Sequence, residues 1–260
     1  MPVNRDFDGL LARIVCPICR GKLSAQHARL RCTGCGTEFG LHENTPVLTT
    51  NGSTAPSLAA RLHYALLGNP RVYDFQQAHG GGPQIAAQVK KALRDAHDAT
   101  VIDIGAGTGM AATIVPAGAR YVWLDNDKLK LRGLLTKPVE CFAVLGDATR
   151  LPFPDASADW TLMVEVSHHL PAKAFDECLD ETARVTRSRF IFIDAVRGKR
   201  LRSKLLWQLD LGRFPRTEED LLVALEKRFE IETIERFRVN HDHLLCVCVP
   251  RLSDVRSVAI

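Results

Sequence analysis

The sequence lacks several features that would place it in a special class of protein. No apolar run approaches the ~20 residues that a membrane-spanning helix needs. The first residues, MPVNRDFDGL, have no apolar core of the secretory type. The net charge of +4 is low for a protein whose main partner is RNA, and we find no internal repeat or low-complexity tract. We therefore expect a globular protein located in the cytoplasm.

Half of the eight cysteines form a pattern typical of metal binding. Cys16 and Cys19 lie in CPIC, and Cys32 and Cys35 lie in CTGC, with twelve residues between the two motifs. In a reducing compartment such a set predicts zinc ligands rather than disulfides. Four thiolates complete a tetrahedral site and leave no position open for water, so we expect a structural zinc ion. The remaining cysteines have apolar neighbours and are expected to pack as small hydrophobic residues: Cys141, Cys178, Cys246 and Cys248.

Short apolar runs after residue 100 predict a sheet of parallel strands. Runs that are apolar on both faces fit strands covered by helices on each side. The runs are Thr100–Ile104, Tyr121–Leu124, Cys141–Leu145, Trp160–Val164 and Phe190–Asp194.

Other patterns predict helices and a terminal hairpin. Leu58–Leu67 and Ile85–Leu93 are expected to be helical, and Thr217 is expected to begin a helix with acidic residues in its first turn. Phe229–Phe237 and Leu244–Val249 are joined by the short polar turn NHDH, which predicts an antiparallel pair.

A glycine-rich loop follows the first of the parallel strands. VIDIGAGTG, residues 101–109, has the spacing G-x-G-x-G and an acid, Asp103, two residues before the first glycine. The dinucleotide fingerprint is G-x-G-x-x-G, and it places a helix N-terminus under a pyrophosphate. An acid beside the loop suits a cationic ligand better than a phosphate.

Two further acids follow neighbouring strands. Asp125 ends the second strand, where a carboxylate can accept both hydroxyl groups of a ribose, and Asp147 follows the third, where a carboxylate can accept from an adenine amino group. Carboxyl ends of parallel strands meet at one edge of a sheet, so the three acids are expected to share one ligand site.

With these motifs, roughly residues 70–250 resemble the class I S-adenosylmethionine-dependent methyltransferases. LPFPDASADW followed by MVEVSHHL is typical of the methyltransferase type 11-like branch, which methylates small molecules. The resemblance implies an α/β fold with a Rossmann-like, doubly wound sheet of seven strands, the last of them antiparallel. It also implies a cofactor site, to which we add Tyr73 as a residue that closes over the ligand, with simple packing as the alternative. The predicted cofactor residues are Tyr73, Asp103, Gly105, Ala106, Gly107, Asp125, Asn126, Asp147, Ala148 and Glu165.

The N-terminal segment resembles a second family. FDGLLARIVCPICRGKL and the later TPVLTT match the small zinc-ribbon proteins that activate tRNA and protein methyltransferases. Those activators are separate proteins that dock on an enzyme, whereas here the ribbon is fused ahead of one. We expect the ribbon to have a docking or stabilising role, in which it contacts either its own catalytic domain or a second subunit of a homodimer. The predicted division is a ribbon at 1–48, a linker with helices at 49–84, a methyltransferase domain at 85–250 and a flexible tail at 251–260.

Residues after the fourth strand are the candidates for catalysis. His168 and His169 have the side-chain chemistry of a general base, and the alternative is that one caps a helix and the other packs. No N-P-P-[YF] motif follows this strand, which argues against adenine N6 and glutamine as acceptors. Oxygen, carbon and ring nitrogen acceptors remain open, and oxygen or carbon is preferred.

A basic segment follows the fifth strand. Arg197, Lys199, Arg200 and Arg202 are candidate contacts for an anionic small-molecule substrate, with a solvated face, a lid or a membrane contact as alternatives. The same segment and the ribbon keep an RNA methyltransferase as the second hypothesis. A non-catalytic protein that retains the cofactor fold is the third.

Overall fold

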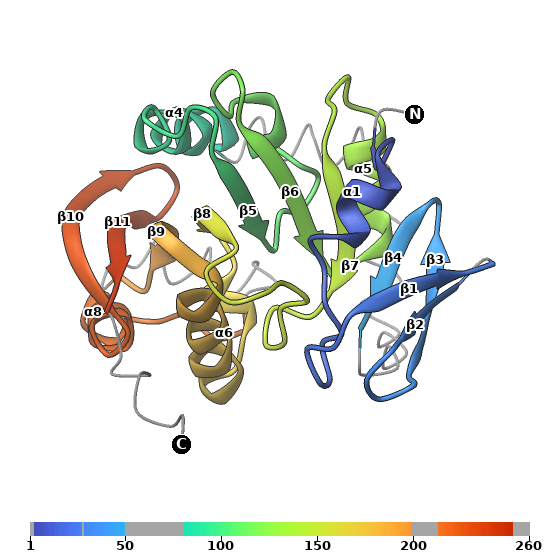
Figure 1. Ribbon diagram of the computed structural model, residues 1–260. Coiled ribbons are helices and arrows are strands. Elements are labelled where there is room, and N and C mark those ends of the chain that lie inside the picture. Colours follow the sequence, from blue (N-terminus) through green and yellow to red (C-terminus); the bar gives the residue numbers. More distant parts are fainter. Residues whose placement is uncertain (1–2, 28, 50–80, 199–212, 252–260) are drawn as a thin grey trace.

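The protein is described from a computed structural model at residues 3–27, 29–49, 81–198 and 213–251. A single sheet of eleven strands runs through these residues in the order β1-β2-β3-β4-β7-β6-β5-β8-β9-β11-β10 (Figure 1). The predicted helix Leu58–Leu67, most of the predicted linker and all but Arg251 of the predicted tail lie outside the described residues.

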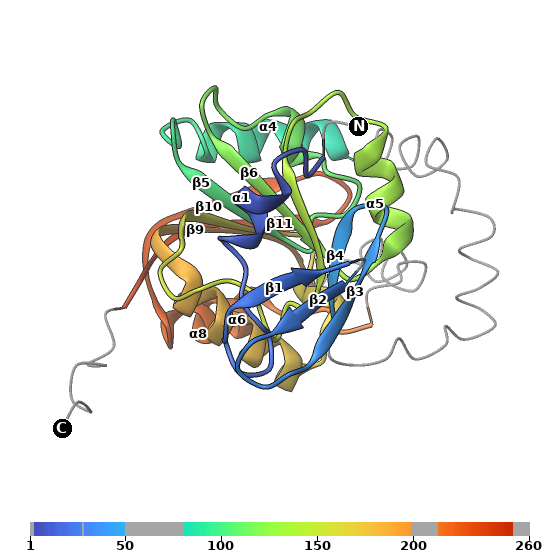
Figure 2. The same ribbon diagram turned by 45° about the vertical axis from the view of Figure 1, so that its right-hand side comes forward.

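The N-terminal segment supplies four short antiparallel strands at one end of the sheet (Figure 2). The short helix α1, Phe7–Leu11, precedes them, and the Asp6 side chain accepts the N–H of Gly9 at its start. The strands are β1 Leu23–Gln26, β2 Arg29–Cys32, β3 Glu38–His42 and β4 Thr45–Leu48.

The central strands are parallel, as the apolar runs predicted. They are β5 Thr100–Ile104, β6 Arg120–Asp125, β7 Phe142–Gly146, β8 Ala158–Val164 and β9 Thr186–Val196. The helices among them are α4 Gly82–Ala92, the short 3-10 turn η1 Ala111–Thr113, α5 Lys128–Leu135, the 3-10 turn η2 Ser167–His169 and α6 Ala172–Val185.

The C-terminal elements form the predicted hairpin. Helix α8, Glu218–Glu226, begins with a capping box in which Thr217 and Asp220 satisfy each other's backbone N–H. Strands β10 Phe229–Arg238 and β11 Asp242–Pro250 pair with each other, and β11 also pairs antiparallel with β9. The start of β11 therefore lies beside the end of β9.

Helices cover both faces of the sheet, so the predicted α/β architecture is confirmed. Apolar residues of α4 and α5 pack on one face with Val101 of β5, whereas those of α6 and α8 pack on the other face with Ile102. This division follows the alternation of side chains along a strand. Figure 1 shows α4 on one side of the sheet and α6 with α8 on the other.

The ribbon joins the sheet through β4, which lies parallel to β7. Val47 and Leu48 pair there with Leu145 and Gly146. The sequence predicted a seven-stranded sheet with a separate ribbon, but this pairing makes one sheet of eleven strands. A local apolar pattern cannot reveal such a pairing, because the backbone groups at a strand edge carry no sequence signal.

Asn4 reinforces the junction between the ribbon and β7. Its side chain is 1% exposed, accepts the N–H of Ala143 at 2.7 Å and donates to the Ala143 carbonyl at 3.1 Å. It also donates to the carbonyl of Asn44 at 3.0 Å. One buried side chain thereby links the N-terminal residues, the β3–β4 turn and strand β7.

No helix among the described residues has the length and apolar character to cross a membrane.

Candidate active site and zinc centre

The glycine loop lies at the carboxyl end of β5 and touches the segment after β8. Gly105 has a φ of 71°, and a Cβ added there would lie 2.6 Å from Cγ2 of Val166. Only glycine therefore fits beside Val166 without a shift. The close approach places Glu165 and Val166 next to the loop, as expected for a site built from β5 and β8.

Asp125 fixes the loop from the neighbouring strand. Its Oδ2 accepts the N–H of Gly107 at 2.9 Å, and its Oδ1 accepts the N–H of Asp127 at 3.0 Å. Trp123 donates its Nε1–H to the Gly107 carbonyl at 2.8 Å. A carboxylate offers about four lone-pair sites, so Asp125 keeps capacity to accept ligand hydroxyl groups.

Asp103 lies beneath the loop rather than on the surface. It is 4% exposed, and its Oδ2 accepts the hydroxyl of Tyr121 at 2.6 Å. Burial raises the pKa of Asp103 to about 7, the Tyr121 hydrogen bond opposes that shift, and Asp125 adds to it.

The other predicted cofactor residues lie along the same edge. Asp147 follows β7, and its Oδ1 accepts from the N–H and the hydroxyl of Thr149 at 2.9 and 2.8 Å. Ala106 is buried, Ala148 is half-buried and Asn126 is exposed. Tyr73 lies outside the described residues. The roles assigned to these residues remain predictions.

Glu165 directly follows β8 and has a backbone conformation that few non-glycine residues adopt. Its φ is 58°, and its N–H donates to the carbonyl of Ile193 at 2.9 Å. His243, at the start of β11, places Nε2 3.3 Å from Glu165 Oε1. Burial raises the pKa of Glu165, and the facing His243 partly opposes the rise. Backbone strain of this kind is concentrated at functional sites.

His168 is buried in the wall of the site. It is 4% exposed, and its Nδ1 lies 2.5 Å from Oδ1 of Asp194. Oδ2 of Asp194 accepts the N–H of Ser167 at 2.6 Å. Burial raises the pKa of Asp194, but the contacts with His168 and Ser167 lower it by more, so the net shift of the pKa is downward. This contact gives His168 a defined orientation, and His169 is exposed beside it.

Arg216 holds the same turn from the other side. Its guanidinium donates to the carbonyls of Ser167 and Leu170, the latter at 2.7 Å, and lies 4.4 Å from the ring centre of Phe175. The predicted substrate residue Arg197 is exposed and donates its backbone N–H to the Arg216 carbonyl at 2.7 Å. Lys199, Arg200 and Arg202 lie outside the described residues.

Sequence reasoning missed three residues of this site: Asp194, Arg216 and His243. Asp194 carries a usable signal, because it is an acid inside a run of apolar residues at the end of a parallel strand. His243 carries none, since its place depends on how β11 pairs with β9.

The four predicted zinc ligands converge in the ribbon. Their Sγ atoms all lie within 4.8 Å of one another, and the residues are Cys16, Cys19, Cys32 and Cys35. The Sγ atoms are 3.7 Å apart for Cys16 and Cys35 and 3.4 Å apart for Cys19 and Cys32. Tetrahedral zinc with Zn–S bonds of ~2.3 Å sets its sulfurs about 3.8 Å apart, so the donor set fits the ion. The N–H of Gly34 lies 3.4 Å from Cys32 Sγ, as expected for a thiolate ligand.

The family comparison agrees with the geometry of the edge. A protein-family model described as "Methyltransferase domain" matches residues 102–193, from within β5 to within β9. Over these residues the chain is similar to that family. The match includes the glycine loop, Asp125, Asp147 and Glu165.

A curated protein to which this chain is similar is the fatty-acid O-methyltransferase of Mycolicibacterium smegmatis. It is 35% identical over 130 residues, which cover 47% of this chain and 43% of the relative. The match thus spans less than half the length of that protein.

Two solved structures share the fold. One is a chain of a complex that contains the Trm112 methyltransferase activator of Haloferax volcanii, with 16% identity, a TM-score of 0.60 and coverage of 74% of this chain and 98% of that chain. The other is the mitomycin 7-O-methyltransferase MmcR, with 24% identity, a TM-score of 0.54 and coverage of 72% and 60%.

Proposed function

We propose that the protein transfers a methyl group from S-adenosylmethionine to an oxygen atom of a small molecule. The methyltransferase domain match, the name of the curated relative and the fold shared with MmcR support this proposal. The observation that carries it is the pairing of Asp125 with the glycine loop through Gly107. Because of that contact, the Asp125 carboxylate lies directly beside the glycine loop and still has lone pairs that can accept hydrogen bonds from a ligand.

The proposed cofactor would lie along the carboxyl edge of the sheet. Asp147 and Ala148 after β7 would meet the adenine, Asp125 after β6 the ribose, and the loop at Gly105 with Asp103 the methionyl part. Bound there, S-adenosylmethionine supplies a methyl carbon activated by a sulfonium. The residues of the edge would then orient that carbon toward β8, and positioning of this kind is the main source of rate in an in-line displacement.

The zinc ion would have a structural role. Cys16, Cys19, Cys32 and Cys35 would hold it and fold the ribbon, whose β4 pairs with β7 just before Asp147. No water or substrate position remains on a zinc ion with four thiolates. The ribbon would therefore support the edge of the catalytic sheet rather than take part in the chemistry.

Isothermal titration with S-adenosylmethionine tests the cofactor assignment. Asp125→Ala should weaken binding about 10- to 100-fold, because each hydrogen bond to a charged group contributes about 1.5–3 kcal/mol. Asp95→Ala, at an exposed carboxylate in the connection between α4 and β5, should bind as the unchanged protein does. Absence of binding by the unchanged protein, or equal binding by Asp125→Ala, would refute the proposal. A retained affinity without turnover would favour the non-catalytic hypothesis.

The RNA hypothesis rests on the ribbon and on the basic segment, of which Lys199, Arg200 and Arg202 lie outside the described residues. Filter binding of total RNA across a salt series distinguishes it, since phosphate contacts give a steep loss of affinity with salt. We expect weak binding with no such slope.

A further inference from the structure

Three polar side chains continue the edge beyond the glycine loop, on the side away from Asp125. Glu165 directly follows β8, Asp194 lies near the end of β9, and His243 is the second residue of β11. Because β11 is antiparallel and His243 pairs with Ala195, its side chain reaches the same edge as the other two. If the methyl donor lies over the glycine loop, as the proposed function has it, these residues face the acceptor.

The ring of His243 is held in one orientation. Its Nδ1 lies 2.9 Å from the carbonyl oxygen of His241, and a carbonyl only accepts, so Nδ1 carries a hydrogen. Phe237 stacks on the ring with centres 5.0 Å apart and planes 20° apart. In this orientation Nε2 points toward Glu165 Oε1, which lies 3.3 Å away.

Glu165 is held in place but is not fully hydrogen-bonded. Its Oε1 is buried and the contact with His243 does not have hydrogen-bond geometry. The side chain as a whole is 31% exposed, so part of it is reachable from outside. A strained backbone, one buried oxygen and a partly open side chain describe a carboxylate set up to meet a ligand.

The charged residues next to Glu165 and His243 are already paired with other groups of the protein. His168 of η2 and Asp194 of β9 face Glu165, and Asp194 also accepts the N–H of Ala195. Among the described residues, two further charged groups nearby bind elsewhere: Arg216 contacts backbone carbonyls, and Arg238 of β10 pairs with Asp242 of β11 at 2.8 Å. Within the described ranges, the one ion pair of Glu165 is with His243.

This charge pattern suits an uncharged acceptor. A carboxylate acceptor would bring a third negative group beside Glu165 and Asp194, where burial weakens the screening by water. A hydroxyl group brings no charge and carries the proton that Glu165 can accept. His243, but not Glu165, also lines a cleft of about 450 Å³, together with Val196, Phe237 and the paired charges of Glu218 with Arg236 and of Arg238 with Asp242.

We propose that the acceptor is a neutral alcohol or phenol, that Glu165 accepts its proton, and that His243 is the positioning residue that keeps Glu165 ionised. The acceptor O–H bond breaks, its oxygen forms a bond to the methyl carbon, and the C–S bond breaks with its electron pair left on sulfur. The proton goes to Glu165 and then to solvent. A fatty acid, the acceptor in the relative's name, is ionised before it binds and needs no such group.

The first test measures the pair without any acceptor. Burial lowers the pKa of His243, but Glu165 raises it more, so the net shift is upward from the usual 6.5. Titration of the His243 ring by NMR, assigned with His243→Gln, should show a lower pKa in Glu165→Gln than in the unchanged protein. The exposed His97→Gln variant is the control and should leave it unaltered. An unaltered His243 pKa in Glu165→Gln would overturn the pairing.

The second test measures transfer of a tritiated methyl group to para-alkylphenols, long-chain alcohols and palmitate. We expect the phenols or alcohols to be methylated, with kcat reduced about 100-fold or more in Glu165→Gln and KM little altered. In His243→Gln the pH midpoint of kcat should move upward, because Glu165 loses the partner that lowers its pKa. Methylation of palmitate alone, or of none of the panel, would overturn the inference.

Titration of S-adenosylmethionine into the same preparations separates the two proposals. Full cofactor binding by the unchanged protein with no effect of Glu165→Gln on phenol or alcohol turnover refutes this inference alone. Failure to bind S-adenosylmethionine refutes the proposed function itself.

Discussion

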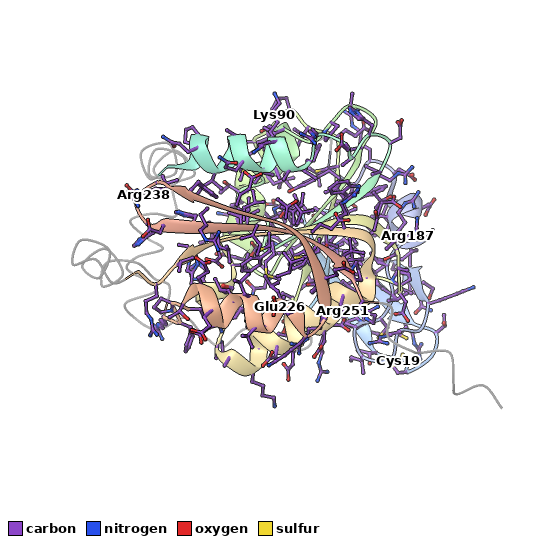
Figure 3. All side chains as sticks on the ribbon, turned by 90° about the vertical axis from the view of Figure 1, so that its left-hand side faces the viewer. Cys19, Lys90, Arg187, Glu226, Arg238 and Arg251 are labelled. Atoms are coloured by element: carbon purple, nitrogen blue, oxygen red, sulfur yellow. The ribbon has the colours of Figure 1, made fainter. Side chains whose placement is uncertain are left out.

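Two clusters of this chain bring metal-ligating side chains equally close together and yet differ in what they can do. One ligand atom from each of the four ribbon cysteines lies within 4.8 Å of the others, and the same holds for Glu165, His168 and Asp194. Cys19 of the first cluster and Arg238, which ends the strand paired with the start of β11, lie on opposite sides of the molecule (Figure 3). Proximity alone therefore does not define a metal site.

The difference lies in what already satisfies the ligand atoms. Asp194 accepts two backbone N–H groups and contacts His168, so its charge is balanced by the protein. In the ribbon, the thiol groups mostly face one another, and no cationic side chain balances them among the described contacts. A group of thiolates needs a cation for stability, whereas an acid with an imidazole holds a proton instead.

Loss of the ribbon metal should have the largest effect. We expect one zinc per chain by elemental analysis, and none in Cys32→Ser. Structural zinc contributes about 10–16 kcal/mol to the folding of isolated zinc-finger peptides, so the ribbon should unfold without it. Chelation of the unchanged protein should reproduce the loss of thermal stability, and Cys141→Ala should keep its zinc. A chelator-treated protein with an unaltered Tm would contradict the comparison.

Asp194→Asn should have the next largest effect, about 3–5 kcal/mol of unfolding free energy, because it leaves buried groups without their charged partner. The folded-state pKa of Asp194 is lowered, so its contribution is present above the ordinary value of 3.8 and is lost as pH falls through the folded value. Denaturant unfolding at pH 7 and pH 3 should thus show a smaller difference between variant and unchanged protein at the lower pH. An equal difference at both pH values would count against the pair.

Asn4→Ala should cost about 1–3 kcal/mol, since it leaves the Ala143 N–H and C=O without their buried partner. Hydrogen exchange should become faster in β4 and β7 before it changes in β9. The matched change Asn44→Gly removes one longer contact, 3.3 Å from the Asn4 carbonyl, and should have less effect. Exchange that rises uniformly across the sheet would show that Asn4 does not act at the junction.

Arg20→Ala should have the smallest effect, no more than about 1 kcal/mol. Arg20 joins the first cysteine knuckle to Glu181 at 3.2 Å, but its side chain is 56% exposed and such pairs contribute little. Glu181, 15% exposed, also accepts the N–H of Leu151 at 2.8 Å, so Glu181→Gln should cost more than Arg20→Ala. The reverse order in a thermal melt would give the knuckle contact more weight than its exposure allows.

The sequence predicted those parts of the fold that local patterns encode. The apolar runs located β5 to β9, the acids after Thr217 located α8, and the spacing of Cys16 to Cys35 located the cysteine cluster. What it could not predict are pairings between distant segments: β4 on β7, and β11 beside β9. Backbone hydrogen bonds create both, and they leave no periodic signal in the side chains.

The residues of the candidate site also divide into those that a local sequence pattern predicts and those whose contacts depend on the pairing of distant segments. Asp103, Asp125 and Asp147 could be predicted to lie near one another because each lies in or directly after its own apolar run, and the structure brings them to one edge of the sheet. His168 was found from its residue type, but its contact with Asp194 was not. The partnership of Glu165 and His243 was invisible, since it depends on the register of β11 against β9.

A crystal structure with bound S-adenosylhomocysteine tests the central claim most directly, because the claim orders the cofactor along the carboxyl edge of the sheet. We predict the ribose hydroxyl groups on Asp125, the adenine next to Asp147 and the sulfur on the Glu165 side of the glycine loop. A ligand that binds elsewhere, or that lies in the reverse direction with its sulfur toward Asp147, would contradict the account.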